Sequence, residues 1–513
     1  MKRLPKIFCT AAATGLIAVS ALPLSACSKN SNELVLRVSN WEEYIDLGGW
    51  DESEKIDLES GDIFGENSMV DDFTEWFNAN HDYTVRVEYS TFGTNEDLYN
   101  RLNLGDTYDL VCPSDYMIMQ LMREGKLEKF SEEFRNVSVE TNYYAQNVSP
   151  FISNAFESFN GNEYAAGYMW GTTGIVYNPE KVDTEDVATW NILRNPKYSR
   201  QVTIKDNVRD SYFPTLGILH ADKLISGEGE PDELLNATDD ETIGAALQIL
   251  KEIKENVYSF ETDSGKADMI TGKVVANYQW SGDAVFIMDE ADDDSNPTEL
   301  WYSVPDECTN LWFDGWVMLK DGILGDERKK TAAEAFVNFL SRPDNAIRNM
   351  YYIGYTSAIA GETVHEYLEW NYGVGVDDGE TAALNNDIVD KIETYSYDVS
   401  NFFGEGSEPI IVDKSTLEID GNGNINRGRQ LFAQYPPENI TERSVIMVDF
   451  KDRLAAINQM WINVRCLDVK DFKPAVVWTV VAIAVAGITA ILLYKFRYQI
   501  FYRQPKVLKN NNS

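Results

Sequence analysis

The sequence of 513 residues has little positive charge. Lys and Arg number 44 against 83 Asp and Glu, which gives a formal net charge of −39 at pH 7. Proteins that bind nucleic acid present a basic face, so this imbalance argues against that class. A strongly acidic chain instead suits a ligand or partner that carries positive charge. At about 150 residues per domain, the length predicts two to four domains.

Cysteine is also scarce. The five residues are Cys9, Cys27, Cys112, Cys308 and Cys466. The last three are far apart, so they make no disulfide framework and allow at most one bridge. No CxxC pair occurs, so no thiolate metal site is indicated.

The common catalytic motifs are missing. The sequence has neither a GxxxxGK[ST] phosphate loop nor a GxSxG nucleophile elbow, and none of its three His lies in HExxH. The stretch from Asp420 to Asn424 is similar to the start of a calcium loop. Ile425 and Leu431 stand where that loop needs Gly and Glu, so a turn is predicted. We expect no cofactor, no metal centre and no catalytic residue.

The N-terminus has the pattern of a secretory signal. Residues 1–26 begin with three basic side chains and continue with an apolar stretch over 7–24, which is short for a membrane span. The sequence Leu-Ser-Ala-Cys at 24–27 resembles the lipobox of bacterial lipoproteins, which predicts lipidation of Cys27. The alternative is an ordinary signal peptide with a chance cysteine.

The C-terminus has a second membrane signal. Residues 475–494 carry no charge and are long enough to cross a bilayer, which predicts one transmembrane helix rather than a buried core helix. Five basic residues and no acid follow in 495–513, so the positive-inside rule places that tail in the cytoplasm. Without the three positive charges of the signal and the five of the tail, the rest of the chain carries −47.

Between these ends the chain alternates predicted strands and helices, which indicates βαβ units. Two segments, 46–65 and 361–428, are rich in Asp, Glu and Gly and read as insertions on the surface. The predicted strands are 34–38, 85–89, 108–112, 172–177 and 274–280, and the predicted helices are 70–77 (capped by Asn67 or Ser68), 98–104, 243–253 and 332–340.

Aromatic and acidic residues occur together, several of them just after a predicted strand. Open α/β sheets place their ligand crevices at those strand ends. Aromatic rings attract an alkylammonium group through their negative faces, and carboxylates accept its protons. A dication needs a carboxylate near each end, because an unpaired charge is costly to bury. The pieces are Trp41 to Tyr44, Ser114 to Tyr116, Asp206 to Tyr212, Trp280 to Asp283, Trp312 to Asp314 and Gly354 to Thr356.

From 34 to about 464 the chain resembles the spermidine/putrescine-binding subunits of ABC importers. The resemblance implies an α/β periplasmic-binding-protein-like fold of type II, with two lobes joined by crossing hinge strands. It implies one lobe at 34–169 and 314–357, and another at 170–313 and 358–470. The stretches that carry it are SNWEEYI (39–45), VEYSTFGTNEDLYNRL (87–102), YDLVCPSDYMI (108–118), MWGTTGIVYNPEKV (169–182), ANYQWSGDA (276–284), LWFDGWVML (311–319), FVNFLSRPDNAIRNMYYIGYTSA (336–358) and YPPE (435–438).

The same resemblance implies a ligand site, with Asp314 as the central ammonium partner. Glu42, Asn207 and Met447 depart from the pattern, because a spermidine binder carries Thr, Asp and Gln there. The loss of that Asp leaves open whether the ligand is spermidine or the shorter putrescine. The expected ligand-binding residues are Trp41, Glu42, Tyr44, Ser114, Tyr116, Asn207, Asp210, Trp280, Trp312, Asp314 and Tyr355.

The resemblance therefore predicts a polyamine receptor without enzyme activity on the outer face of the cytoplasmic membrane, working with permease subunits and a cytoplasmic ATPase. The C-terminal span departs from the family and is read as a second anchor or the relic of a fused permease. Two alternatives remain. A ferric-ion receptor of the same fold would use tyrosine pairs such as 143–144 and 351–352. A carbohydrate hydrolase would use paired carboxylates.

Overall fold

The computed structural model describes residues 32–293, 297–374, 392–466, 482 and 485–495. The predicted signal at 1–26 and the lipidation site Cys27 lie outside these residues, as does the predicted tail from residue 496 onward. The predicted span at 475–494 lies partly outside them, and 485–495 is helical. Among the described residues, no helix combines the length and apolarity that crossing a membrane requires.

The chain divides into two units, Met1–Ile457 and Asn458–Ser513. The first unit starts with a parallel sheet in which β1 (Glu33–Trp41) lies between β4 (Thr84–Phe92) and β5 (Leu110–Val111). α1 (Met69–Asn80) packs on this sheet through Phe73 and Phe77, which are fully buried. Ser68 caps α1 by accepting a hydrogen bond from the Asp71 amide, so the predicted helix and one of its two predicted caps are confirmed.

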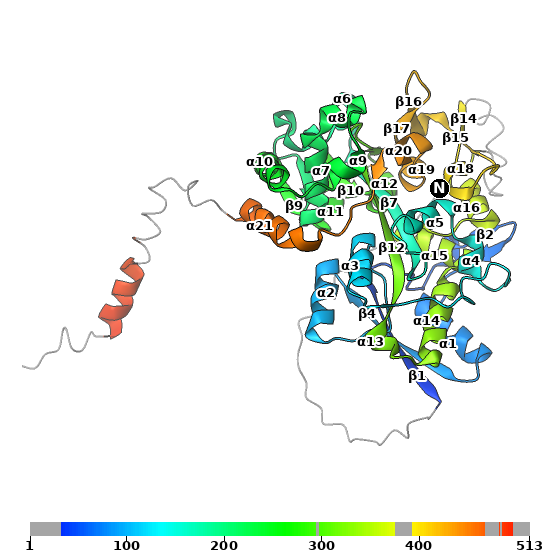
Figure 1. The fold of residues 1–513 in the computed structure, drawn as a ribbon. Helices are drawn as coiled ribbons and strands as arrows, with labels where there is room; N and C mark the ends of the chain where they lie inside the picture. The colour runs from blue at the N-terminus through cyan, green and yellow to red at the C-terminus, as the bar shows by residue number, and fades with distance from the viewer. Residues whose placement is uncertain (1–31, 294–296, 375–391, 467–481, 483–484, 496–513) are drawn as a thin grey trace, which may run out of the picture. The chain divides into compact units, whose positions relative to one another are not determined.

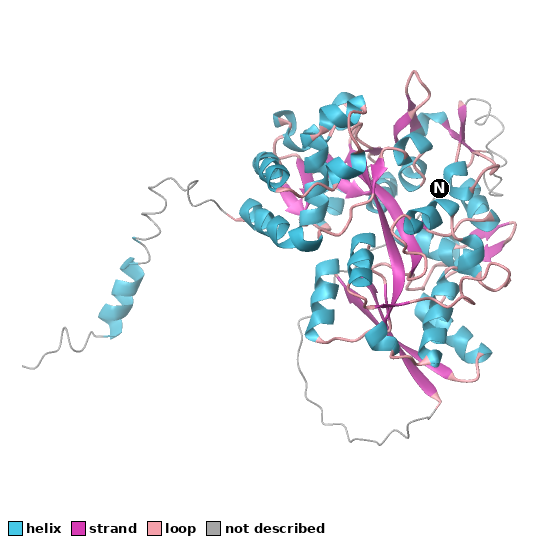
Figure 2. Cartoon of the chain, viewed as in Figure 1, coloured by secondary structure: helices cyan, strands magenta, loops and turns pink. Residues whose placement is uncertain are grey.

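Two long antiparallel strands connect this sheet with a second one (Figures 1 and 2). β7 (Ala165–Tyr177) and β12 (Thr309–Leu319) are buried along their whole length. The last residues of β12 pair with β5 in the first sheet. The last residues of β7 pair with β10 (Ala276–Trp280) and β11 (Trp301–Ser303) in the second. β7 therefore pairs with strands of the second sheet and, along the rest of its length, with β12, which pairs with the first sheet.

The second sheet continues from β10 to β8 (Val202–Lys205) and β9 (Ser259–Glu261), and these neighbours pair in parallel. Helices α7 (Val208–Leu219) and α12 (Ser281–Asp293) start directly after β8 and β10, so βαβ units are present here too. The acidic run at 289–293 forms the end of α12.

The structure contains further helices and strands. The helices are α2 (Asn95–Leu104), α3 (Asp115–Arg123), α4 (Tyr143–Asn147), α5 (Pro150–Glu157), α6 (Thr184–Val187), α8 (Ala221–Ser226), α9 (Pro231–Leu235), α10 (Asp240–Asn256), α11 (Ser264–Ile270), α13 (Lys320–Ile323), α14 (Glu327–Leu340), α15 (Pro343–Ile353), α16 (Glu362–Tyr372), α18 (Ser400–Phe403), α19 (Gln430–Gln434), α20 (Glu438–Thr441) and α21 (Leu454–Arg465). The strands are β2 (Ile56–Leu58), β3 (Gly61–Ile63), β6 (Leu127–Glu128), β13 (Thr356–Ser357), β14 (Thr394–Tyr397), β15 (Ile410–Asp413), β16 (Leu417–Ile419), β17 (Ile425–Gly428) and β18 (Ser444–Val445).

The two segments predicted as surface elaborations contribute to the core, so that expectation is wrong for their described parts. In 46–65, Trp50 and Ile56 are buried, and Asp46 accepts hydrogen bonds from the buried guanidinium of Arg348. In the described residues of 361–428, the buried side chains are Val364, Tyr367, Leu368, Tyr397, Val399, Phe402, Ile410, Val412, Leu417 and Ile425. The sequence did not indicate these buried side chains, because the apolar residues are widely spaced among acidic ones.

The described cysteines form no disulfide. Cys112 and Cys308 are buried free thiols, and Cys466 is exposed. The turn predicted at 420–424 is confirmed, because the Asp420 carboxylate accepts the amides of Asn422 and Asn424 between β16 and β17.

Candidate polyamine-binding site

Most of the predicted site residues lie where a strand ends and the chain turns into the next element. Tyr44 follows β1, and Ser114 separates β5 from α3. Asn207 separates β8 from α7, and Trp280 is the last residue of β10 before α12. The carboxyl ends of strands are where open α/β sheets bind ligands, so sheet topology gathers these residues.

Asp314 is placed at an irregularity of the crossing strands. The register between β12 and β7 shifts between Asp314 and Gly315, where Tyr168 of β7 has no opposite partner. Such bulges re-aim side chains near functional sites. The Asp314 carboxylate accepts hydrogen bonds from the Ser114 hydroxyl (2.7 Å) and the Tyr44 hydroxyl (2.8 Å). Only 6% of Asp314 is exposed.

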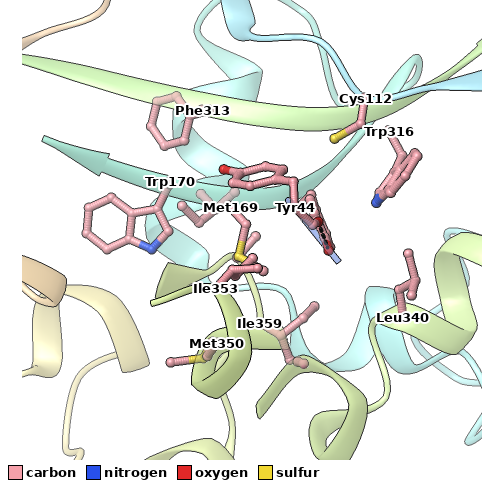
Figure 3. Close-up of a cluster of buried hydrophobic side chains, with 14 of the residues drawn as sticks. Tyr44, Cys112, Met169, Trp170, Phe313, Trp316, Leu340, Met350, Ile353 and Ile359 are labelled. Carbon is pink, nitrogen blue, oxygen red and sulfur yellow. Dashed lines mark hydrogen bonds between the residues drawn. The ribbon is translucent and has the colours of Figure 1, made fainter. Parts of the chain in front are cut away.

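Aromatic rings surround this carboxylate. The ring centroid of Tyr44 lies 5.2 Å from that of Tyr355 and 5.6 Å from that of Tyr168, both edge to face. Trp312 lies 5.6 Å from Tyr355. Figure 3 shows Tyr44 among buried apolar side chains that include Met169. The structure thus groups four predicted residues, Tyr44, Trp312, Asp314 and Tyr355, in one aromatic box around an acid.

Two glycines bring Tyr355 to this position. Gly354 ends α15 with φ +79°, a left-handed conformation that side chains disfavour, and its amide bonds to the Met350 carbonyl. A Cβ on Gly282, at the start of α12, would lie 2.2 Å from Cδ2 of Tyr355. The Tyr355 ring therefore packs directly on the backbone of Gly282, and its hydroxyl donates to Asp283 (3.0 Å).

The second carboxylate of the site is Asp210 in the first turn of α7. Asn207 caps this helix, because its side-chain oxygen accepts the amides of Arg209 and Asp210. The Asn207 side-chain amide donates to the Asp210 carboxylate, and the Trp280 indole nitrogen lies 3.4 Å from it. The positive end of the helix dipole also favours a carboxylate here. Asn207 thus has a local structural role at the position where the resemblance expected an acid.

Burial dominates the electrostatics of both carboxylates. Burial raises the pKa of Asp314 to about 6, while the bonds from Ser114 and Tyr44 lower it and the charge of Asp210 raises it. Burial likewise raises the pKa of Asp210 to about 6, against the nearby charge of Lys205. The charge of Asp210 reaches Asp314, so the two acids lie in the same part of the structure. Both would gain from a bound cation, which would restore the charge balance that burial disturbs.

A cluster of buried charges adjoins the site, and sequence reasoning missed it. Lys205 is the last residue of β8, with 1% of its side chain exposed. Its ammonium nitrogen lies 3.5 Å from Glu261, 3.6 Å from Asp283 and 4.1 Å from the ring centroid of Trp280. Lys266 lies 3.6 Å from Asp283 as well. Only the positions of these residues in the sequence could have indicated the cluster, because Lys205 ends a strand and Asp283 lies shortly after Trp280.

Tyr116 belongs to a neighbouring cluster. Its hydroxyl accepts from Asn95 (2.8 Å) and lies 3.3 Å from Glu96. The guanidinium of Arg209 lies 3.7 Å above the Tyr116 ring and 3.9 Å from the Phe450 ring. The cation that covers Tyr116 is thus one of the chain's own side chains, which the sequence did not reveal.

The other singled-out residues are less closely involved. Trp41 packs on Phe92 with a centroid distance of 4.8 Å, and its buried indole nitrogen has no hydrogen-bond partner among the described residues. Glu42 is exposed, and Met447 is buried. No described contact joins Trp41 or Glu42 to Asp314. Their role as ligand contacts stays a prediction.

The tyrosine pairs proposed for a ferric ion are used in packing. Tyr144 stacks on Phe134, and its hydroxyl accepts the amide of Gly167 (2.9 Å). Tyr351 packs on Trp50. Within the part of the chain that the structure describes, no three His, Cys, Asp or Glu side chains are grouped to hold a metal. Two cavities there, of about 220 and 280 Å³, are lined by neither Asp210 nor Asp314.

Comparison with known sequences identifies relatives. The profile described as "Bacterial extracellular solute-binding protein" matches residues 68–365, more than half of the chain. A spermidine/putrescine-binding periplasmic protein of Salmonella typhimurium is 28% identical over 338 residues, covering 65% of this chain and 80% of that protein. A putrescine-binding periplasmic protein of Pseudomonas aeruginosa is 27% identical over 332 residues, covering 63% and 77%. These relatives are solute-binding proteins and not enzymes, in agreement with the sequence-based expectation and against the hydrolase alternative.

Comparison with solved structures supports the fold. A putative spermidine/putrescine ABC transporter from Listeria monocytogenes has a TM-score of 0.53 at 22% identity, covering 84% of this chain and 98% of that one. A lipoprotein of Treponema pallidum has a TM-score of 0.54 at 17% identity, covering 84% and 99%. The predicted mixed α/β, periplasmic-binding-protein-like fold is thereby confirmed. By sequence profile and by fold, the chain belongs to the family of bacterial extracellular solute-binding proteins.

Proposed function

We propose that this protein is an extracytoplasmic receptor for polyamines of the putrescine and spermidine kind, which it delivers to an ABC importer. The observation that carries the proposal is the pair Asp210 and Asp314. Both are buried, and among the described residues neither has a Lys or Arg nitrogen within 4.0 Å. Two buried acids that lack a salt bridge to any described Lys or Arg favour a cationic ligand.

The surrounding side chains fit an alkylammonium better than a metal ion. Tyr44, Trp312 and Tyr355 offer ring faces and edges near Asp314, and Trp280 does so near Asp210. Each cation–ring contact contributes about 0.5–2 kcal/mol, and the rings also cover methylene groups. Micromolar affinity needs about −8 kcal/mol, which these contacts and two charge-assisted pairs could supply.

Delivery to an importer requires a place at the membrane. In this proposal Cys27 is the lipid anchor, 475–494 is a single span and 495–513 is a cytoplasmic basic tail. Closure of two lobes, 34–169 with 314–357 and 170–313 with 358–470, would enclose the ligand by a hinge motion. One span forms no channel, so separate permease subunits and an ATPase would complete the transporter.

Isothermal titration of the full-length protein tests the proposal. Putrescine, spermidine, spermine and glycine betaine would be titrated in turn at physiological salt. One-to-one binding of at least one di- or polyamine with micromolar affinity or better is expected, with weaker binding of glycine betaine, a zwitterion with no net charge. If none of the amines binds, the family's fold is retained here for a different solute, and the proposed function is wrong.

A further inference from the structure

A lysine of the protein itself lies beside the candidate site. The Lys205 ammonium lies 4.1 Å from the Trp280 ring centroid, 3.6 Å from Asp283 and 3.5 Å from Glu261. It donates a hydrogen bond to the Thr262 carbonyl (2.9 Å), which fixes its position. An aromatic face with carboxylates is the environment expected for a ligand ammonium group.

The carboxylates near the site therefore fall into two classes. Asp283 faces both Lys205 and Lys266, and Glu261 faces Lys205. Asp210 and Asp314 have no Lys or Arg within salt-bridge distance among the described residues. The buried Asp115 accepts the amides of Tyr116 and Phe313. Asp210 and Asp314 are thus the buried acids of the aromatic box that a ligand can pair with, and Asp283, which contacts the box through Tyr355, is already balanced.

We propose that Lys205 is a specificity-determining residue that takes the place of one ligand ammonium at Trp280 and Asp283 and restricts the site to diamines. This inference rests on the proposed polyamine-binding function. Two ammonium groups of a diamine can each pair with Asp210 or Asp314. The additional ammonium of spermidine would be repelled by Lys205, and by Arg209 and Lys266 close by, without a further buried carboxylate of the aromatic box to offset the repulsion.

The identity of residue 207 agrees with this distribution of charge. Asn207 is neutral, and its amide donates to Asp210. An acid at this position would add a third unbalanced charge, as a ligand with three ammonium groups requires. The neutral Asn207 and the positive Lys205 both make the Asp210 end of the site less negative. Both features therefore reduce the number of ligand ammonium groups that the site can pair with.

The experiment measures the ratio of putrescine to spermidine affinity in the full-length protein by isothermal titration. Wild type is expected to bind putrescine at least tenfold more tightly than spermidine. K205M should lower this ratio at least fivefold, mainly by tighter spermidine binding. K205R keeps the charge and should keep the preference. K273M removes a half-exposed lysine that pairs with Asp268, and it should leave the ratio unchanged.

K205M leaves Glu261 and Asp283 buried with less compensation, so K205M/E261Q is the second variant. It removes a charge of each sign and should show the same loss of diamine preference. A wild-type protein that binds spermidine as tightly as putrescine overturns the inference while the proposed function stands, whatever the variants do. An unchanged ratio in either folded variant also overturns it. Failure of wild type to bind any amine instead refutes the proposed function itself.

Discussion

At the scale of single residues, Asp314 concentrates the features of the candidate site. Its carboxylate is buried, accepts bonds from Ser114 and Tyr44, and is surrounded by aromatic rings. Hydroxyl donors orient a carboxylate without neutralising it, so its charge is still available to a cation.

We expect D314N to weaken diamine binding at least tenfold, or about 1.4 kcal/mol, because the amide keeps the shape and loses the charge. Isothermal titration at fixed ionic strength measures the effect. D321N changes an exposed acid two residues beyond the end of the same strand and serves as control. Wild-type affinity in D314N would show that Asp314 does not contact the ligand.

Acid should release the ligand. Burial raises the pKa of both Asp210 and Asp314 to about 6, and a dication pairs only with their ionised forms. Affinity should therefore fall at least tenfold between about pH 7 and about pH 5. Titrations across this range measure it. A flat profile would mean that neither carboxylate pairs with the ligand.

The stability of the unliganded protein should respond with the opposite sign. A raised pKa in the folded state means that folding retains protons, so the contribution of Asp314 to stability falls as pH rises from about 4 to about 6. D314N removes this effect. The free energy of unfolding of D314N relative to wild type should therefore increase over that window, by up to about 3 kcal/mol. Urea unfolding at both pH values measures the difference, and a constant difference would contradict the assigned burial.

At the scale of elements, the site depends on three helix starts after strand ends. α3, α7 and α12 bring Ser114, Asp210 and Gly282 to one region, and the backbone of α12 supports Tyr355. Local sequence determines these turns. The pairing of the strands determines that the three helix starts lie in one region.

G282A is expected to displace Tyr355, because the added methyl would lie 2.2 Å from its ring. We expect diamine affinity to fall at least tenfold, with loss of the tyrosine bond to Asp283. Titration and the thermal melting point are measured together. G244A is the control, since Gly244 in α10 has open space at its Cβ, and this change should raise stability by about 0.5–1 kcal/mol. Unchanged affinity in G282A would place Tyr355 outside the site.

At the scale of the whole molecule, two crossing strands and a buried arginine connect the two sheets. Arg209 of α7 lies between the rings of Tyr116, in α3, and Phe450, and donates to the Val448 carbonyl (2.7 Å). α3 contacts the first-sheet end of the structure through β12, and α7 follows a strand of the second sheet. Arg209 therefore bridges the halves that β7 and β12 join.

Removal of this bridge in R209A should favour a more open unliganded protein. Each ring contact contributes about 0.5–2 kcal/mol, so diamine affinity should fall about three- to tenfold. Small-angle scattering should show a larger radius of gyration without ligand than in wild type, and a decrease on adding putrescine. R86A, which changes an exposed arginine on β4, should leave both quantities unchanged. An unchanged radius in R209A would show that the contact does not hold the halves together.

Much of the local structure follows from the sequence alone. The pattern of apolar residues predicted β1, β4 and β10, and Ser68 was one of two predicted caps for α1. Aromatic residues beside acids indicated the chemistry of the ligand. These features depend on neighbours within a few residues, so they can be read along the chain.

The sequence by itself determined the alternating elements, the missing catalytic motifs and the kinds of side chain that a cation would need. Only the tertiary structure decided that Lys205 balances Asp283, and that Asp210 and Asp314 have no Lys or Arg within salt-bridge distance among the described residues. It also decided that Arg209 covers Tyr116, and that segments with an acidic composition contribute to the core. The physical reason is that charge balance and burial depend on distances of a few ångström between residues far apart in the chain, which only the paired strands define.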